Sequence, residues 1–202
     1  NDAVPPGPRP VYFHGSGRSN LPPQQESEVS SASRDKMYLP NSSTCFVCGE
    51  DNASGLRTRF YVEEDRVKMP LTAVQHHCGY ENTVHGGIVA AALDECMGWA
   101  AARAIRRMCV TAELTVRYID RVPVAPDLVV EAEVTKAHKR MVQTEARIVD
   151  GTGKVFARAE GRFLPLSEEE TLRVDDALLY RGGEERVFDE LRETRAVPGI
   201  SG

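Results

Sequence analysis

One stretch in the middle of the chain, from Gly86 to Ala102, constrains the fold more than any other. Apart from Asp94 and Glu95, it contains only apolar or small residues. It is too short, and too rich in glycine and alanine, to span a membrane, which takes ~20 strongly apolar residues. The stretch therefore predicts a helix that is buried on most of its sides.

Asp94 is the first candidate functional residue of this helix, because a buried carboxylate is costly unless another group pairs with it or uses it. Gly87 precedes it by seven residues. The two therefore share one helix face and lie ~10 Å apart along the axis. One small carbonyl cannot touch both within a single helix. Two antiparallel copies related by a two-fold axis could place Gly87 of one chain opposite Asp94 of the other.

The amide of Gly87 lies at the expected start of the helix, where free N–H groups and the helix dipole favour negative charge. An oxyanion donor that faces a carboxylate suits acyl transfer or hydrolysis. Simpler explanations stay open at this point. Paired glycines are often only a tight turn, and Asp94 could form an ion pair with Arg103 or Arg106.

Composition narrows the class of protein. The 202 residues supply one domain with additional segments. The net charge of −5 disfavours general nucleic-acid binding. No stretch is typical of a signal peptide or a membrane span. The five cysteines show no disulfide framework, so we expect a reducing, cytoplasmic location.

The chain divides into three parts by composition. Residues 1–40 are rich in proline, glycine and serine and are interpreted as an extended or disordered arm. Residues 41–166 form the predicted domain. Residues 167–202 are expected to form a helical appendage, in which Ser167 and Glu170 cap a first helix and residues 184–195 form a second.

The second half of the predicted domain alternates with a period of two over four runs, at 111–118, 128–135, 141–148 and 154–163. This pattern indicates antiparallel strands with one face on a core, arranged as a meander. In the first run, strict alternation places Thr111 on the face opposite to Leu114 and Tyr118. A strand pair is also expected at 56–62 and 66–71. The predicted fold class is α+β, a curved antiparallel sheet wrapped around the central helix.

Cys45 and Cys48 form a C-x-x-C pair, which raises the question of a metal or redox centre. Structural zinc takes four ligands, and the nearby His76, His77 and Cys78 do not complete such a set. A redox pair would open a helix after a strand, whereas loop-forming residues follow here. We interpret the pair as small buried residues in a compact turn and expect no metal and no cofactor.

Three segments carry a family likeness: His85-Gly86-Gly87, Asp94 nine positions after the histidine, and the run from Val110 to Tyr118. Together they resemble the hotdog-fold acyl-CoA thioesterases, in the subgroup related to phenylacetyl-CoA thioesterase and the mammalian thioesterase superfamily members. The opening Cys45-Phe-Val-Cys48-Gly49, with Asn52 and Gly55-Leu56, is similar to the start of many bacterial members.

The resemblance implies five or six strands around the helix, an acyl-CoA substrate, and a homodimer or dimer of dimers with active sites between subunits. It implies that Asp94 is the catalytic carboxylate, acting on water or directly on the carbonyl. The Gly87 N–H would be the oxyanion donor. Thr111 would orient the attacking water, and His85 would shape the oxyanion turn.

Further residues are expected at the substrate. Gly86 belongs to the same turn as Gly87. Asn82 is a departure from the phenylacetyl-CoA type, which places its asparagine six residues before the histidine, where this chain has Gly79. Coenzyme A phosphates need cations. We expect these from Arg121, Lys139 and Arg140, because loops near strand ends usually carry binding groups.

Two other functions compete with hydrolysis. The chain could be a non-catalytic acyl-CoA sensor that keeps the fold and the ligand site but does not turn substrate over. It could also be a hotdog dehydratase, which pairs a catalytic histidine with an acidic residue on the helix. The His-Gly-Gly opening fits the dehydratases less well, and a pure binding protein needs neither Asp94 nor Thr111.

Overall fold

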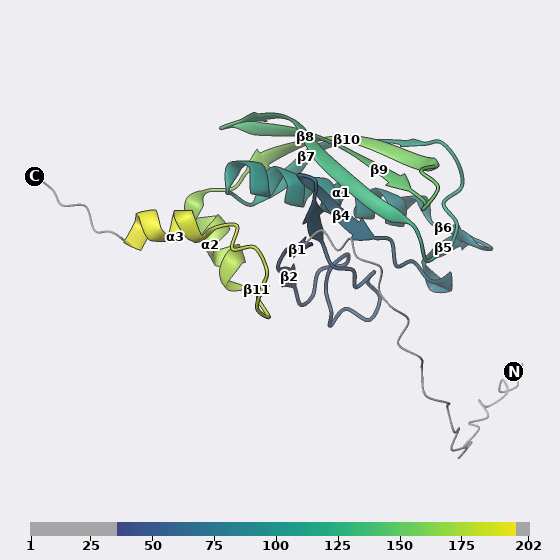
Figure 1. Cartoon of the computed structure of the whole chain (residues 1–202), viewed down its shortest axis with the longest axis horizontal. Helices are drawn as coiled ribbons and strands as arrows, with labels where there is room; N and C mark the ends of the chain where they lie inside the picture. The colour runs from purple at the N-terminus through teal and green to yellow at the C-terminus, as the bar shows by residue number, and fades with distance from the viewer. Residues whose placement is uncertain (1–35, 197–202) are drawn as a thin grey trace, which may run out of the picture. The chain divides into compact units, whose positions relative to one another are not determined.

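The structure, a computed structural model, describes residues 36–196 of the chain (Figure 1). The helices are α1 (Gly86–Ile105), α2 (Glu168–Asp176) and α3 (Asp189–Ala196), with a 3₁₀ turn at Gln75–His77. The strands are β1 (Met37–Tyr38), β2 (Asn41–Ser42), β3 (Tyr61–Glu63), β4 (Arg66–Pro70), β5 (Cys78–Tyr80), β6 (Thr83–Val84), β7 (Cys109–Tyr118), β8 (Val129–His138), β9 (Met141–Val149), β10 (Val155–Pro165) and β11 (Leu178–Leu179).

A seven-stranded antiparallel sheet packs against α1, in the order β1-β3-β4-β8-β9-β10-β7 (Figure 1). The predicted α+β class and the sheet wrapped around a central helix are confirmed. The predicted meander is wrong in one connection. Strands β8, β9 and β10 follow one another, but β7 pairs with β10 and not with β8. The chain between β7 and β8 crosses to the other side of the sheet, and β7 becomes an edge strand.

The buried residues of helix α1 run from Val89 to Ala102, as its composition predicts. Leu93, Met97 and Ala101 are fully enclosed. Small residues let the sheet approach closely. A Cβ on Gly161 of β10 would lie 2.6 Å from the Phe163 ring and 3.2 Å from the Met97 side chain. The glycine therefore makes room for Phe163, which packs beside Gly98 of the helix.

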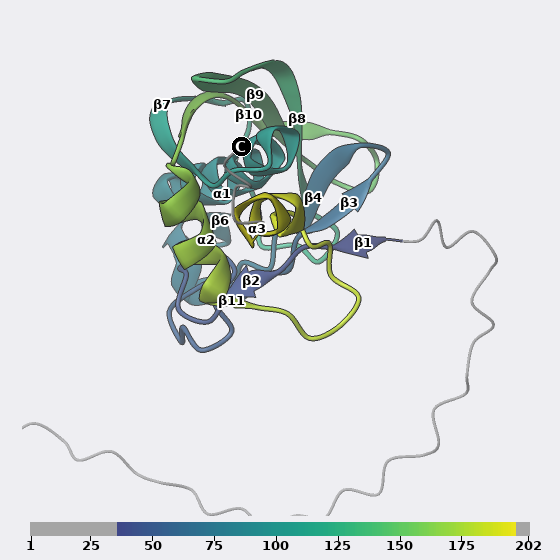
Figure 2. The ribbon, with the colours of Figure 1, turned by 90° about the vertical axis from the view of Figure 1, so that its left-hand side faces the viewer.

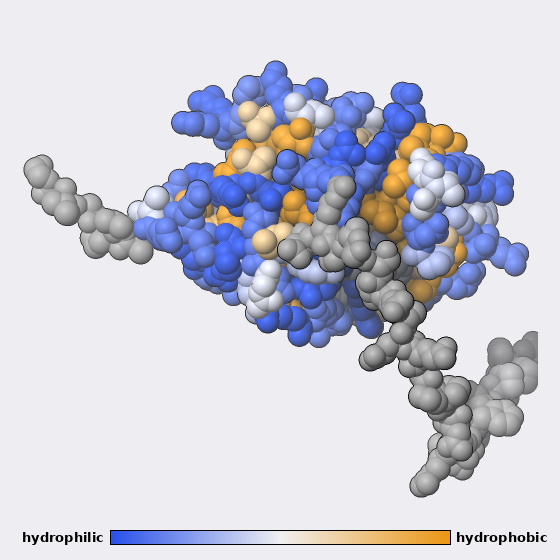
Figure 3. All heavy atoms as spheres, in the orientation of Figure 1, coloured by the Kyte–Doolittle hydropathy of each residue, from blue (hydrophilic) through white to orange (hydrophobic). Residues whose placement is uncertain are grey.

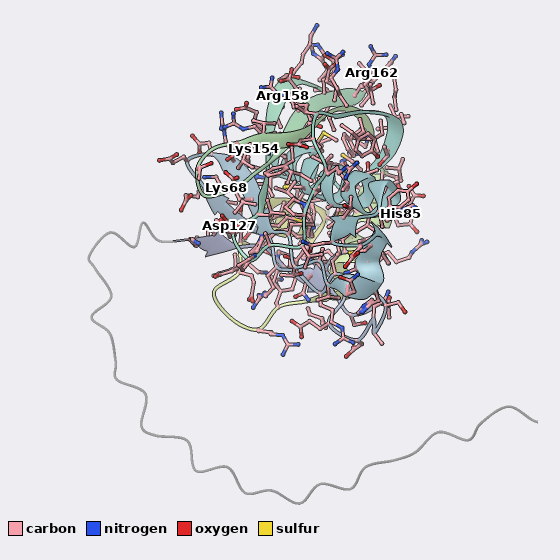
Figure 4. The ribbon with its side chains drawn as sticks, turned by 90° about the vertical axis from the view of Figure 1, so that its right-hand side faces the viewer. Lys68, His85, Asp127, Lys154, Arg158 and Arg162 are labelled. Carbon is pink, nitrogen blue, oxygen red and sulfur yellow. The ribbon has the colours of Figure 1, made fainter. Side chains whose placement is uncertain are left out.

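The outer face of the sheet is charged. Arg158 and Arg162 of β10 point away from α1 (Figure 4). On neighbouring strands, Glu131 is nearly buried and forms an ion pair with Arg147. Arg66 lies 3.5 Å from the same carboxylate. One face of the sheet is therefore apolar and covered by α1, and the other is polar.

The C-terminal segment contains the predicted first helix. Ser167 caps α2 and forms a reciprocal capping box with Glu170. The predicted second helix over 184–195 is wrong at its start, because α3 begins at Asp189. Glu184 accepts hydrogen bonds from the backbone N–H groups of Arg181 and Gly182, which fix this segment as a turn. Figure 2 shows α2 and α3 side by side.

The predicted N-terminal arm falls mostly outside the described residues, which begin at residue 36. Within the described part of that segment, β1 pairs with β3 at the edge of the sheet. The division of the chain at residues 40 and 166 stays a prediction. Among residues 36–196, none of the helices combines the length and the apolar character that a membrane crossing needs.

Candidate active site

The N-terminus of α1 forms one half of the candidate site. His85 is the N-cap residue, and its Nδ1 accepts a hydrogen bond from the Gly87 N–H at 3.0 Å. The Tyr118 hydroxyl, at the end of β7, donates to the Gly86 carbonyl at 2.7 Å. The start of the helix is thus held by two hydrogen bonds, one to the His85 ring and one from the Tyr118 hydroxyl. His85 lies on the side of the molecule that faces the viewer in Figure 4.

A pocket of about 530 Å³ opens beside this turn. Its size falls in the range of small-molecule sites, ~300–1,000 Å³. His85, Gly86, Tyr118 and Arg121 contribute to its lining, together with apolar side chains from β6 and the chain after β7. Hydrophobic residues gather on the surface at the same end of the molecule, near β5 and β6 (Figure 3). The pocket therefore combines an apolar wall with a helix N-terminus and one arginine.

Asp94 forms the other half of the candidate site. Thr111 Oγ1, on β7, donates a hydrogen bond to Asp94 Oδ1 at 2.8 Å. Burial raises the pKa of Asp94 above its ordinary value, and the hydrogen bond from Thr111 lowers it in part. Asp94 and Thr111 line a cavity of about 80 Å³ with Glu95, Gly98 and Trp99. A carboxylate held by a hydroxyl in a half-buried cleft is suited to bind and polarise a water molecule.

A β-bulge puts Thr111 in reach of Asp94 and corrects the alternation argued from the sequence. Gly161 of β10 pairs with Leu114, but Phe163 pairs with Thr111, so that Ala112 is an extra residue on β7. Thr111 therefore shares the helix-facing side with Leu114, not the opposite side. The prediction that Thr111 and Leu114 oppose one another is wrong, because strict alternation does not hold through a bulge.

The simple ion-pair explanation of Asp94 does not hold. Arg103 and Arg106, the two cations considered as partners, instead bind Glu185 at 2.6 and 2.9 Å. Both arginines thus join the end of α1 to the segment before α3. In the described part of the chain, the hydrogen-bond partner of Asp94 is the hydroxyl of Thr111 and not a cation. Its carboxylate is therefore not explained as half of a structural ion pair with either arginine.

Within one chain, the two halves of the candidate site lie in different depressions. The pocket at the helix N-terminus and the cavity around Asp94 share none of their lining residues. Strand β7 passes both, with Thr111 near its start and Tyr118 at its end. Its outer edge has no neighbouring strand in the described sheet. Val110 and Tyr118 are 49% and 52% exposed there.

The remaining predicted residues are not all brought together. Asn82 lies in the turn between β5 and β6 with a positive φ of 53°. Arg121 lines the large pocket. Lys139 and Arg140 form the turn between β8 and β9 and line none of the cavities that hold His85 or Asp94. Gly79, six residues before His85, lies beside the His85 ring, and a Cβ on it would be 3.1 Å from His85 Cδ2.

Two residues at the site were missed in the sequence. Tyr118 ends the run that carries the family likeness, and its contact with Gly86 could have been suspected from an exposed aromatic at a strand end. Glu95 follows Asp94 and points toward Cys45 Sγ, 3.5 Å away. The signal for Glu95 was its own position, since it is the second carboxylate in an otherwise apolar helix.

Comparison with known proteins identifies the fold family. Residues 81–157 match the model of the thioesterase superfamily. RHA08564, a solved thioesterase superfamily protein, is 26% identical with a TM-score of 0.55, over 59% of this chain and 62% of the other. The match thus spans less than two thirds of that protein. No curated protein matches the sequence significantly.

Two further solved structures have the same fold at lower identity. AziG of S. sahachiroi is 20% identical with a TM-score of 0.51, over 55% of this chain and 92% of that protein. The E. coli PaaI protein, from the phenylacetic acid degradation operon, is 18% identical with a TM-score of 0.50, over 55% and 81% of the two chains. The resemblance to hotdog-fold proteins of the thioesterase superfamily is confirmed.

Proposed function

We propose that this chain, which has the hotdog fold of the thioesterase superfamily, hydrolyses an acyl-CoA thioester to a free acid and coenzyme A. The observation that carries the proposal is the hydrogen bond of Thr111 to Asp94, at the cleft that β7 and α1 form. A hydroxyl and a half-buried carboxylate in one cleft can hold a water molecule between them. The match of residues 81–157 to the thioesterase superfamily model supports the reaction class.

In this mechanism Asp94 takes a proton from a water molecule that Thr111 helps to orient, and the water oxygen attacks the thioester carbonyl. A tetrahedral intermediate forms, whose oxyanion accepts a hydrogen bond from the Gly87 N–H. The carbon–sulfur bond then breaks, and coenzyme A leaves as thiolate. A thiol has a pKa of ~8.5, so its departure requires no strong general acid. Direct attack by the Asp94 carboxylate, followed by hydrolysis of the anhydride, uses the same groups.

The His85 ring gives the oxyanion step a specific requirement. The Gly87 N–H donates to His85 Nδ1 in the structure, so the substrate oxygen must replace or share this acceptor. Since N-cap side chains compete with ligands for the same first-turn amides, His85 would hold the donor in place until substrate arrives. This assigns His85 a positioning role at the turn.

The proposed site needs two chains. His85 and Gly86, the neighbours of Gly87, line one depression and Asp94 lines another. In the described sheet, β7 has an open, partly apolar edge. Antiparallel pairing of this edge with its copy is a two-fold arrangement. It would bring Thr111 of one chain toward Tyr118 and the helix N-terminus of the other. We therefore propose a homodimer as the smallest active unit, which could associate further as a dimer of dimers.

The proposed coenzyme A site uses the large pocket. The acyl or pantetheine part would lie on its apolar wall, and Arg121 at its rim would bind phosphate. Lys139 and Arg140, on the β8–β9 turn, would contribute only if that turn reaches the ligand. A cytoplasmic location fits the five free cysteines and belongs to the same proposal.

The experiment that tests the proposal measures release of thiol from short, medium, long and aryl acyl-CoA esters. Wild-type protein and Asp94→Asn are compared at matched folding by circular dichroism. We expect turnover of at least one ester class, and a loss of ~10³-fold or more in kcat for the variant. Turnover that survives in the variant would remove Asp94 from the mechanism.

The non-catalytic sensor remains the second candidate because the Gly87 N–H already has an acceptor in the structure. If wild-type protein binds acyl-CoA without releasing thiol from any ester of the panel, that result identifies the sensor and rejects hydrolysis. Isothermal titration with the same esters supplies this measurement.

A further inference from the structure

The C-x-x-C segment forms a turn that presents its two sulfur atoms together. The Gly49 N–H donates to the Cys45 carbonyl at 2.9 Å and closes the turn. The Val47 N–H donates to Cys45 Sγ at 3.3 Å. A Cβ on Gly49 would lie 2.3 Å from the Cys45 carbonyl oxygen, so only glycine fits there. An amide that points at a sulfur stabilises the thiolate form, which is the form that binds metal ions.

A third ligand comes from helix α1, which the sequence analysis did not consider. Glu95 Oε1 lies 3.5 Å from Cys45 Sγ and 3.9 Å from Cys48 Sγ. The three candidate ligand atoms lie within 4.8 Å of one another. Cys48 is 2% exposed. Two sulfurs and a carboxylate oxygen thus converge from two segments that are about 50 residues apart in the chain.

Glu95 has no cationic partner in the described part of the chain. Among the residues that the structure describes, no basic side chain forms an ion pair with Glu95. Its carboxyl group accepts hydrogen bonds from the thiols of Cys45 and Cys48. A largely buried carboxyl group whose partners are two thiols is suited to share a cation with them.

We propose that Cys45, Cys48 and Glu95 form a binding site for a thiophilic divalent cation of the zinc class. Zinc binds thiolates at ~2.3 Å and carboxylate oxygens at ~2.0 Å, so tetrahedral ligands lie ~3.5 Å apart for S–O pairs and ~3.8 Å for S–S pairs. The separations in the cluster already match this within a few tenths of an ångström for both S–O pairs. Three protein ligands leave one position for water or an anion.

The site would fasten the 45–49 turn to α1 one residue beyond Asp94. It goes beyond the proposed hydrolysis, because no step of that reaction uses the cation and its test reads binding and stability, not turnover. The other chemistry open to two neighbouring cysteines is a disulfide, which would need an oxidant. A disulfide leaves Glu95 without a role, whereas the cation uses all three groups.

The experiment is zinc binding to the full chain, purified under reducing conditions and freed of metal by a chelator. Zinc titration in competition with a chromophoric chelator gives the stoichiometry and affinity. We expect one zinc per chain. We expect Cys45→Ser and Cys48→Ser each to lower the affinity by ~100-fold or more and Glu95→Gln by ~10-fold or more. Cobalt in place of zinc should show thiolate-to-metal charge-transfer absorption.

Two variants serve as matched controls. Cys78→Ser removes a thiol on β5, and Glu160→Gln removes an exposed carboxylate on β10. Both should bind zinc as wild type does. Where a variant of Cys45, Cys48 or Glu95 fails to fold, the proposal is tested by the melting temperature of the wild-type protein. Zinc should raise its melting temperature, and a chelator should reverse the rise. Wild-type protein that binds no zinc, or binding that is unchanged in Cys45→Ser and Cys48→Ser, would overturn the proposal.

Discussion

Thr111 donates a hydrogen bond to Asp94 across the cleft between β7 and α1, with 2.8 Å between the two oxygen atoms. The partners lie 17 residues apart, on an edge strand and a buried helix. The contact exists because Ala112 is an extra residue on β7, which turns Thr111 toward the helix. One bulge thus brings a polar pair together in a cavity that Glu95 and the apolar side chains of Trp99 and Phe163 also line.

Replacement of Thr111 tests the role of this hydroxyl. Thr111→Val keeps the shape of the side chain and removes the donor, so in the proposed mechanism it lowers kcat by ~10²-fold. Thr111→Ser keeps the hydroxyl and should stay within a few-fold of wild type. Steady-state kinetics with the best acyl-CoA ester, at saturating substrate, separate the two variants. Equal values of kcat for valine and serine would show that the hydroxyl does not take part.

The fold was largely predictable, and the orientation of Thr111 was not. The apolar run from Gly86 and the alternating strands predict a helix under an antiparallel sheet, because the spacing of apolar residues along the chain shows which face of each element is buried. A bulge leaves no such trace here. Ala112 is a small residue that fits either face, so the pattern through it reads as unbroken alternation.

Replacement of Gly87 tests the oxyanion donor. The two variants, proline and alanine, differ in whether residue 87 keeps its backbone N–H. Gly87→Pro removes the N–H but keeps helical geometry, since proline is tolerated in the first helical turn. In the proposed mechanism it lowers kcat by ~10²–10³-fold. Gly87→Ala keeps the N–H, and its Cβ would lie 3.1 Å from His85 Nδ1, which a small shift of the ring relieves. Alanine should therefore retain most of the turnover. A loss of the same size in both variants would point to packing rather than to the N–H.

Long-range contacts set the limit of what the sequence could predict at the candidate site. The C-x-x-C pair was interpreted as a compact turn because the nearby histidines and Cys78 do not complete a ligand set, and its contact with Glu95 spans about 50 residues of the chain. The alternative that paired Asp94 with Arg103 or Arg106 failed for a related reason, since the partner of both arginines, Glu185, lies some 80 residues further on. Local periodicity reports which face is buried, but it does not report which buried or charged groups meet.

Glu184 gives a prediction for the pH dependence of stability. Its side chain is 3% exposed and lies 2.6 Å from Arg59. Burial opposes its charge, but the hydrogen bonds from Arg59 and two backbone amides outweigh burial and lower its pKa. A lowered pKa stabilises the fold above the unfolded value of ~4.3, and this stabilisation is lost as the pH falls through the folded value.

Glu184→Gln should therefore lower the free energy of unfolding by ~1–3 kcal/mol at pH 7. The difference from wild type should shrink as the pH falls below ~4. Urea unfolding at several pH values measures both. Glu169→Gln is the control, because Glu169 is exposed on α2 and pairs with Arg173 across one helical turn, so it should change stability by less than ~0.5 kcal/mol. A difference for Glu184→Gln that is independent of pH would reject the charge as its source.

Hybrid dimers test whether the proposed site combines Asp94 of one chain with Gly87 of the other. Two chains with different affinity tags, one Asp94→Asn and one Gly87→Pro, are co-expressed and purified through both tags. With shared sites, one site of the hybrid receives both substitutions and the other receives none, so about half of the wild-type activity returns. The reciprocal hybrid pairs a chain that carries both substitutions with a wild-type chain. Each of its sites then has one defect, and it should be inactive. If each site lies within one chain, the first hybrid should be inactive and the second should be half active. That outcome would refute the two-chain site. Hydrolysis itself would still be tested by the Asp94→Asn assay.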